Sequence, residues 1–252
     1  MKISVITIAL NVLPELRKTV DSVICQSFGS YEYIVVDGAS TDGTAEYLNK
    51  EKGINKWISE PDNGIYEAMN KGTRMATGDY CIFMNAGDRF VDNYVLPKIA
   101  PHLDGTDFVL GNEVIIKEGR VIDYYPSKGS FTLKNLLQSS TRHQSIFIRR
   151  NVLIDHPYDE SLRLVSDWKF TLECFLDGRY SFKTVNIDIC LFAAGGATLQ
   201  FFDDGRKERM KVLSAYPDKK YIWGQQYNPS FWVKVRNKFL YFMKSWQYKD
   251  FC

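Results

Sequence analysis

The first hundred residues alternate between short apolar runs and stretches in which apolar positions recur at helical spacing. The apolar runs are residues 3–9, 33–36 and 80–84, and residues 56–59 predict a further short strand. Runs of this length, rich in β-branched residues, are typical of strands buried on both faces. Helical spacing follows Pro14, with Asn11 as a plausible cap, and returns over residues 45–50 and 65–75. Repeated strand–helix units of this length predict an α/β fold with a doubly wound, mostly parallel sheet flanked by helices.

The pattern after residue 100 is less regular. Residues 109–116 and 120–124 predict a hairpin that turns at Glu118 and Gly119. Further along, the pattern predicts a strand at 145–148, a helix at 168–176 and a strand at 186–192. We expect one continuous domain over residues 1–220, divided near residue 100 into two halves. A helical C-terminal tail is expected at residues 221–252.

Composition excludes several classes of protein. The chain has 252 residues, and its 32 Lys and Arg against 30 Asp and Glu leave a formal charge of +2. This balance argues against a protein organised around nucleic acid. Hydrophobic residues make up 45% and charged residues 25%, which are globular values that exclude a disordered or fibrous chain.

Cysteine spacing and hydropathy indicate in which cellular compartment the protein is expected. The 5 cysteines are scattered and form no C-x-x-C pair, which argues against a disulfide framework and a structural zinc site. No charged-then-apolar signal layout precedes the strand-like run at Ile3, and no run of about 18 apolar residues could span a bilayer. We therefore expect a soluble globular domain in the reducing environment of the cytoplasm.

Three aspartates stand where predicted strands end or a predicted helix begins. They are Asp37, Asp88 and Asp167. Ligands of doubly wound sheets gather at the carboxyl ends of the strands, so these carboxylates are candidates for a site, although each is also explained as a helix cap or turn residue. The chain lacks both G-x-G-x-x-G after its first strand and the P-loop motif. A diphosphate held without a glycine cradle needs Mg²⁺ or Mn²⁺, for which Asp88 is the best candidate ligand.

Three segments together resemble glycosyltransferase family 2, whose members have the GT-A fold. These are Ser4-Val5-Ile6-Thr7 with Asn11, the run Ile34 to Thr44 (IVVDGASTDGT), and Asn70-Lys71-Gly72 before Gly78-Asp79-Tyr80. The resemblance is dense over residues 1–95 and thinner to about residue 200. It implies a nucleotide-sugar half at residues 1–100 and an acceptor half at residues 101–220. The implied reaction is inverting transfer of a hexose or N-acetylhexosamine, from a UDP-sugar as the commonest donor. The implied acceptor is a saccharide or lipid-linked molecule in cell-surface polysaccharide assembly.

The same resemblance implies roles on the donor side. Asp37 would hydrogen-bond the base or ribose of the nucleotide. The other implied nucleotide-sugar residues are Thr7, Ile8, Asn11, Asn70 and Asn85. Asp88 would be the last carboxylate of the family's Asp-x-Asp-Asp motif and would bind Mn²⁺ or Mg²⁺. Here that motif is Asn85-Ala86-Gly87-Asp88, so a single carboxylate remains and Asn85 can offer its amide oxygen.

On the acceptor side, Asp167 resembles the catalytic base of the family's Glu-Asp pair, with Ser166 in place of the glutamate. A carboxylate in that role takes the proton of the acceptor hydroxyl. Asp167 is otherwise explained as the cap of the following helix.

Four weaker candidates complete the expected site. Asp62 and Tyr66 would line the donor pocket, or belong to a plain turn before a helix. His143 would contact the acceptor or a phosphate, or be structural. Thr198, in the Gly-Gly loop that starts at Gly195, would close over the donor, or belong to a flexible turn.

The tail interleaves aromatic with basic residues. They are Tyr221, Trp223, Phe231, Trp232, Phe239, Tyr241, Phe242, Trp246 and Tyr248 with Lys234, Arg236, Lys238, Lys244 and Lys249. A helix of this composition suits the bilayer interface, which would place the protein at the inner membrane, and it equally suits a core-packing or oligomer-forming helix.

Two functions outside catalysis fit the same sequence. A non-catalytic protein that binds nucleotide sugars or glycans would explain the reduced Asp motif. A peripheral membrane or assembly protein would work chiefly through the tail.

Overall fold

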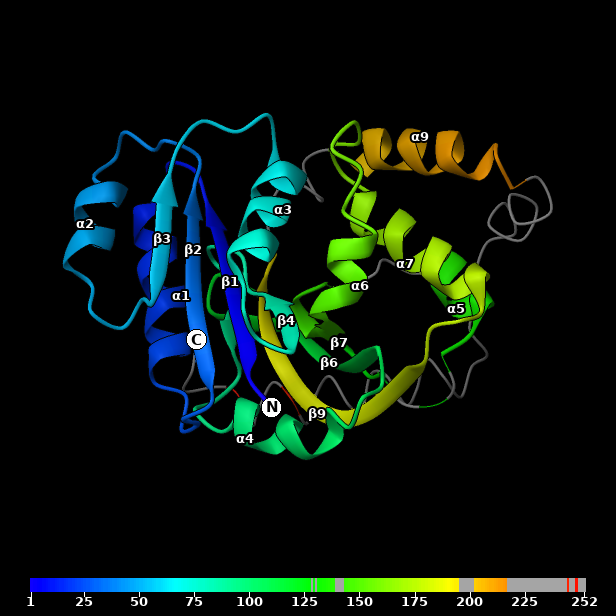
Figure 1. Ribbon diagram of the computed structural model, residues 1–252, viewed down its shortest axis with the longest axis horizontal. Coiled ribbons are helices and arrows are strands. Elements are labelled where there is room, and N and C mark those ends of the chain that lie inside the picture. The colour runs from blue at the N-terminus through cyan, green and yellow to red at the C-terminus, as the bar shows by residue number, and fades with distance from the viewer. Residues whose placement is uncertain are drawn as a thin grey trace.

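The computed structural model describes residues 1–127, 129, 131–138, 143–194, 202–216, 244 and 248 of the chain, and one sheet runs through this part. The sheet order is β3-β2-β1-β4-β8-β6-β9-β5, with β7 beside β6 (Figure 1). The strands are β1 Ile3–Ala9, β2 Tyr31–Asp37, β3 Lys56–Ser59, β4 Tyr80–Phe83, β5 Arg89–Phe90, β6 Phe108–Lys117, β7 Arg120–Tyr125, β8 Ile146–Arg149 and β9 Phe182–Ala193. Strands β1 to β4 are mutually parallel, and β6 and β9 are parallel to each other, whereas β8 runs antiparallel between β4 and β6. The predicted mixed α/β fold with a mostly parallel sheet is confirmed.

Helices cover both faces of this sheet. They are α1 Leu13–Ile24, α2 Thr44–Lys50, α3 Ile65–Met75, α4 Val95–Ile99, α5 Leu133–Gln138, α6 Arg150–Asp155, α7 Ser166–Asp177 and α9 Phe202–Leu213, with 3-10 turns η1 Ala100–His102 and η2 His143–Ser145. Alternate strand residues point to opposite faces, so Val5 packs in one apolar cluster with α1 and α4 while Ile6 packs in another with α3, α6 and α7. In Figure 1, α5, α7 and α9 gather on the opposite side of the view from β1, β2 and β3.

The glycine in the middle of α3 allows this helix to lie directly on the sheet. A Cβ added at Gly72 would stand 2.4 Å from Cγ2 of Ile6 in β1. Because no side chain fits in that space, the approach of α3 to β1 depends on glycine at this position. The close approach matters for function because α3 carries Tyr66 to the carboxyl-end edge of the sheet.

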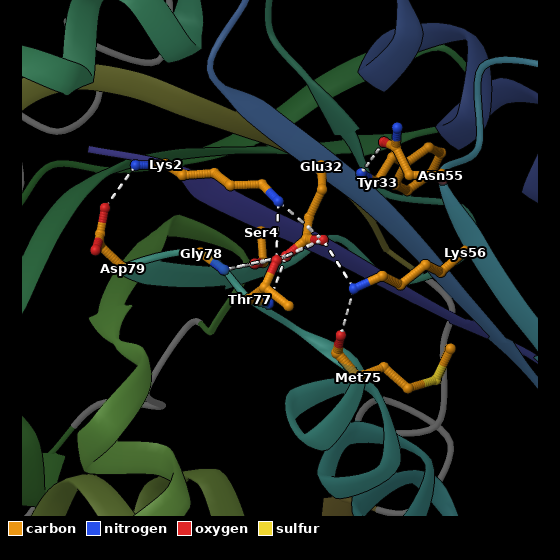
Figure 2. Close-up of polar contacts among 10 residues, drawn as sticks. All are labelled: Lys2, Ser4, Glu32, Tyr33, Asn55, Lys56, Met75, Thr77, Gly78 and Asp79. Atoms are coloured by element: carbon orange, nitrogen blue, oxygen red, sulfur yellow. Dashed lines mark hydrogen bonds and ion pairs between the residues drawn. The ribbon is translucent and has the colours of Figure 1, made fainter.

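A buried carboxylate ties together the amino ends of the first four strands (Figure 2). Glu32 is 3% exposed, and its oxygens accept hydrogen bonds from Ser4 Oγ and from the backbone and hydroxyl of Thr77. Lys2 and Lys56 reach the same carboxylate from two sides, at 3.2 and 3.1 Å. Burial by itself raises the pKa of Glu32, but the hydrogen bonds from Thr77, Ser4 and Lys56 outweigh it and lower the pKa to about 2. This cluster lies at the amino ends of the strands, away from Asp37, Asp88 and Asp167, so its role is to hold strands together.

Most predicted element positions agree with the structure, and the differences have local causes. The strands predicted at 3–9 and 56–59 and the helix at 65–75 match their observed bounds. Asn11 was wrongly predicted to cap α1, because the cap position is Val12. Asn11 instead has a positive φ of 53° and accepts a hydrogen bond from the backbone N–H of Thr41 at 2.8 Å. The short strand β5 was not predicted, since two residues carry no periodicity and its position depends on pairing with β9.

Of the predicted tail, the structure describes Lys244 and Tyr248 alone. Both contact Asp188 of β9, and Tyr248 is 3% exposed within the apolar cluster of α1 and α4. These two residues therefore pack against the sheet, as the core-packing alternative predicts. The other tail residues and the domain boundary at residue 220 lie outside the described residues. No helix among the described segments is both long and apolar enough to cross a bilayer.

Candidate active site

Segments far apart in the sequence meet at the carboxyl-end edge of β1, β2 and β4. The loop after β4 runs alongside β1, where Met84 N–H donates to Ile6 O at 2.8 Å and Ala86 N–H donates to Ile8 O at 3.1 Å. Because β8 is antiparallel to β4, its amino end and the preceding turn η2 reach the same edge. The polar side chains of this edge therefore come from the loop after β4, from η2 and from the start of α7.

Asp167 is held by three different elements. Its Oδ1 accepts a hydrogen bond from the Tyr66 hydroxyl of α3 at 2.9 Å and another from the Trp168 backbone N–H at 2.9 Å. Its Oδ2 lies 2.9 Å from Nδ1 of His143 in η2. Asp167 is 9% exposed and stands inside α7, whose cap position is Val165, so it is not the helix cap that the alternative interpretation required.

His143 joins Asp167 to the loop after β4. A carboxylate only accepts hydrogen bonds, so Nδ1 of His143 carries the proton that faces Asp167. Nε2 lies 2.9 Å from the amide nitrogen of Asn85, which donates to it when the ring is neutral. Burial lowers the pKa of His143, but the neighbouring carboxylates, Asp167 first, outweigh this effect and raise it.

Tyr66 is a hydrogen-bond donor to the carboxylate rather than an exposed pocket side chain. The residue is 4% exposed, and burial followed by the charge of Asp167 raises the pKa of its phenol well above the ordinary value. The phenol therefore stays protonated and donates a hydrogen bond to Asp167 Oδ1. The sequence placed Tyr66 in the site but did not indicate this partner.

Asp88 is held by the residue next to His143. Its Oδ2 accepts from the Gln144 amide at 3.0 Å, and its Oδ1 accepts from the Ala193 backbone N–H at the end of β9, also at 3.0 Å. Asp88 is 5% exposed, and burial raises its pKa to about 7. The turn η2 thus contacts both aspartates through adjacent side chains, a relationship that the sequence interpretation missed. Its only sequence signal is the polar run Arg142-His143-Gln144 before an apolar strand.

Oxygen atoms suitable for a divalent cation are present beside His143. The Oδ1 of Asn85 is buried and, within the described part of the chain, has no hydrogen-bond partner. Each oxygen of Asp88 accepts one N–H, which leaves it further acceptor capacity. No three His, Cys, Asp or Glu side chains gather in a metal-holding group among the described residues. An amide and a carboxylate oxygen nevertheless fit Mg²⁺ or Mn²⁺, which take the rest of their ligands from phosphate and water.

Asp37 organises the loop that follows β2. It is fully buried, and its carboxylate accepts hydrogen bonds from the Ser40 backbone N–H at 3.0 Å, from the Ser40 hydroxyl, and from Ser59 Oγ at 2.6 Å. Asp62 lies across this loop, since a Cβ added at Gly38 would stand 2.7 Å from its Oδ2. The predicted contact of Asp37 with a base or ribose stays a prediction, and the observed contacts of its carboxylate are with the protein.

Two of the remaining predicted residues, Thr7 and Asn70, are hydrogen-bonded within the fold. Thr7 Oγ1 is buried and donates to Met84 O at 2.7 Å. Ile8 is 8% exposed near the end of β1. Both ends of the Asn70 amide bind Tyr158, and its nitrogen also reaches Glu160, so Asn70 holds the segment before α7 against α3. Thr198 and its loop lie outside the described residues. Any contact of these four with a nucleotide sugar stays a prediction.

Comparisons with known proteins agree on the family. Residues 4–161 match the model of "Glycosyl transferase family 2". A PGL/p-HBAD biosynthesis glycosyltransferase of Mycobacterium bovis is 33% identical over 181 residues, which cover 68% of this chain and 69% of the relative. An uncharacterized glycosyltransferase of Mycobacterium tuberculosis is 34% identical over 184 residues, 69% of each chain.

Solved structures share the fold at lower identity. TarS 1-349 of S. aureus in complex with UDP-GlcNAc has a TM-score of 0.71 at 19% identity, covering 88% of this chain and 70% of that one. A mannosyltransferase of Pyrobaculum calidifontis in complex with GDP-Man and Mn²⁺ has a TM-score of 0.63 at 17% identity, covering 86% of this chain and 64% of that one.

Proposed function

The chain belongs to glycosyltransferase family 2, and on that premise we propose that it transfers a hexose or N-acetylhexosamine with inversion, using Asp167 as the catalytic base. The observation that carries the proposal is the arrangement of the Asp167 carboxylate. Oδ1 already accepts two hydrogen bonds, from Tyr66 and Trp168, whereas Oδ2 contacts His143 alone within the described residues. Because each carboxylate oxygen accepts about two hydrogen bonds, Oδ2 is the atom left to take a proton.

The geometry supports a single displacement. Asp167 Oδ2 accepts the proton of the acceptor hydroxyl while that oxygen attacks the anomeric carbon of the donor sugar. The bond between the anomeric carbon and the diphosphate oxygen breaks, and its electron pair leaves with the nucleoside diphosphate. Attack opposite to the leaving group inverts the anomeric configuration. Holding the base in one orientation is the contribution that α3, η2 and α7 make to this step.

The donor side is proposed to lie over the ends of β1, β2 and β4. Asn85 and Asp88 would hold Mg²⁺ or Mn²⁺, which would offset the charge of the departing diphosphate. The loop shaped by Asp37, with Asp62 across it, would receive the nucleoside. UDP is the proposed nucleotide because TarS, a structural neighbour, is described with UDP and UDP-GlcNAc, and GDP is the alternative because the mannosyltransferase is described with GDP-Man.

A saccharide or lipid-linked acceptor is proposed from the relatives. The M. bovis relative is named for PGL/p-HBAD biosynthesis, and this suggests an acceptor in polysaccharide or glycolipid assembly. Transfer of a sugar to such an acceptor would place the protein in the cytoplasm, at the inner face of the membrane. Lys244 and Tyr248 pack on Asp188, so docking to a membrane surface would depend on the other aromatic and basic tail residues.

The test measures release of nucleoside diphosphate from UDP-glucose, UDP-galactose, UDP-GlcNAc and GDP-mannose, with Mn²⁺, Mg²⁺ or EDTA and with a panel of saccharide acceptors. We expect turnover of at least one donor, and a loss of about 100-fold or more in Asp167→Asn with nucleotide binding retained. The matched control is Asp177→Asn at the exposed end of the same helix, which should keep full activity. Tight binding without product under every condition would instead favour a non-catalytic protein that binds nucleotide sugars.

A further inference from the structure

The turn η2 places one imidazole between the proposed base and the loop that faces the donor. His143 Nδ1 lies 2.9 Å from Asp167 Oδ2, and His143 Nε2 lies 2.9 Å from the Asn85 amide nitrogen. The His143 side chain is 14% exposed and that of Asp167 is 12% exposed, so little water competes for these contacts. Both ring nitrogens are already bound to protein groups, which leaves neither for the phosphate or acceptor that the sequence suggested.

We propose that His143 is a positioning residue that fixes the reacting oxygen of Asp167 and, through the same ring, orients the amide of Asn85. This inference rests on the proposed function, because it assigns a role toward the base of that reaction. It adds a relationship that neither the family match nor the sequence motifs contain, namely one rigid ring that couples the acceptor side of the site to the donor side.

His143 contacts Oδ2 of Asp167, which is the oxygen proposed to accept the proton. Tyr66 and Trp168 fill the acceptor capacity of Oδ1, so these two groups fix the carboxylate without contacting its reacting atom. His143 alone among the described residues contacts Oδ2, and one N–H there leaves the other lone pair for the acceptor hydroxyl. Without His143 the carboxylate could rotate or tilt around its remaining two bonds, and a displacement of about 1 Å costs on the order of 100-fold in rate.

The contact with Asn85 concerns which end of its amide faces the His143 ring. With the proton on Nδ1, a neutral His143 ring presents a bare Nε2, which only a donor can satisfy. The amide nitrogen of Asn85 meets that need, and its Oδ1 is thereby turned away from the ring. This Oδ1 is the buried acceptor without a partner in the described part of the chain. A neutral His143 ring therefore keeps the oxygen of this amide, rather than its N–H₂ group, free of a bond to the ring.

The kinetic test uses His143→Ala, His143→Asn and the control His156→Asn, whose ring contacts the exposed Tyr180 hydroxyl. The donor is the nucleotide sugar that the unaltered chain turns over. We expect His143→Ala to lower kcat about 10- to 100-fold, with KM for the donor changed less than about 3-fold. His143→Asn should recover part of kcat, because its shorter amide can donate to Asp167 Oδ2 from nearly the position of Nδ1. An unchanged kcat, a loss confined to KM, or an Asn variant no better than Ala would each overturn the proposal.

A spectroscopic test separates this inference from the proposed function. Long-range ¹H–¹⁵N spectra of the full chain labelled at histidine, recorded at a pH high enough that the ring is neutral, should show His143 as the tautomer protonated on Nδ1, and Asn85→Ala should shift its Nε2 resonance. Spectra that show a neutral His143 ring protonated on Nε2, or an Nε2 resonance that does not shift in Asn85→Ala, would refute the inference even in an active enzyme. If no donor is turned over, the proposed function fails, and the spectra alone decide whether His143 bridges Asp167 and Asn85.

Discussion

The hydroxyl of Tyr66 donates a hydrogen bond of 2.9 Å to Oδ1 of Asp167, although the two residues stand 101 positions apart in the chain. Tyr66 is the second residue of α3, and Asp167 is the second residue of α7. The bond thus connects the helix that packs on β1 with the helix that carries the proposed base. A hydrogen bond to a charged group contributes about 1.5–3 kcal/mol, so the orientation of Asp167 depends measurably on a side chain of the opposite half of the chain.

Tyr66→Phe tests this bond. The ring and its packing stay, while Asp167 Oδ1 loses one of its two donors, so we expect kcat to fall about 10-fold with little change in the KM for the donor. Initial rates at saturating nucleotide sugar provide the measurement. Tyr94→Phe is the matched control, since Tyr94 is 57% exposed. Equal activity of both variants would show that Trp168 and His143 suffice to orient the carboxylate.

Gly72→Ala tests the close approach of α3 to the sheet. Alanine is the better helix former, but its methyl group would meet Ile6 Cγ2 at 2.4 Å, and relieving that overlap pushes α3 away from β1. We expect a loss of about 1–3 kcal/mol in the free energy of unfolding, measured by urea denaturation. Gly29→Ala is the control, because nothing lies within 4 Å of a Cβ at that position. If Gly72→Ala leaves the free energy of unfolding unchanged, α3 moves away from β1 with no loss of stability.

Glu32→Gln tests the buried carboxylate at the amino ends of the strands. The pKa of Glu32 is about 2 in the fold and about 4.3 in an unfolded chain, so folding favours the charged form. The resulting stability is present above about pH 4.3 and is lost as the pH falls toward 2. Denaturation at a series of pH values should show lower stability of the variant at pH 7 and a flatter profile between about pH 5 and 2.

The control for this experiment is Glu46→Gln on α2, an exposed side chain. It should leave both the stability at pH 7 and the slope of the profile unchanged. A Glu32→Gln profile parallel to that of the unaltered chain would contradict the role assigned to Glu32.

Lys244→Gln tests the contact between the tail and β9. Asp188 has a side chain only 11% exposed, and it accepts hydrogen bonds from Asn112 and Tyr124 at 2.9 Å and from Tyr248 at 2.7 Å as well as from Lys244. Burial raises the pKa of Asp188, and the bonds from Lys244, Tyr248 and Asn112 lower it overall. Removing the cation leaves a buried charge without its ion pair, so we expect a loss of about 3 kcal/mol in the free energy of unfolding.

Urea denaturation gives that free energy, and Lys207→Gln is the control because its ion pair with Asp204 is exposed on both sides. A parallel digestion with protease should cut the region after residue 216 faster in Lys244→Gln. Identical stability and digestion in the two variants would show that the tail contact with Asp188 contributes nothing to the fold.

The sequence by itself determined the strands of the first half and the place where chemistry gathers. Apolar runs mark β1, β2 and β4 because a strand buried on both faces needs apolar side chains at nearly every position. Asp88 and Asp167 were identified because a carboxylate directly after such a run, or before a helix, lies at the ligand-binding edge. Both observations depend on neighbours within a few residues, which is the distance over which a sequence pattern carries information.

Only the tertiary structure decided which of these polar side chains touch. His143 reaches Asp167 and Asn85, and Gln144 reaches Asp88, because β8 is inserted antiparallel beside β4 and brings η2 to the same edge. No local pattern encodes that sheet order. The same packing turned Asn11 from an expected cap into a loop contact and placed Tyr248 of the tail in the core. Hydrogen bonds between distant residues follow from the order and direction of strands, which are fixed by how whole faces bury together.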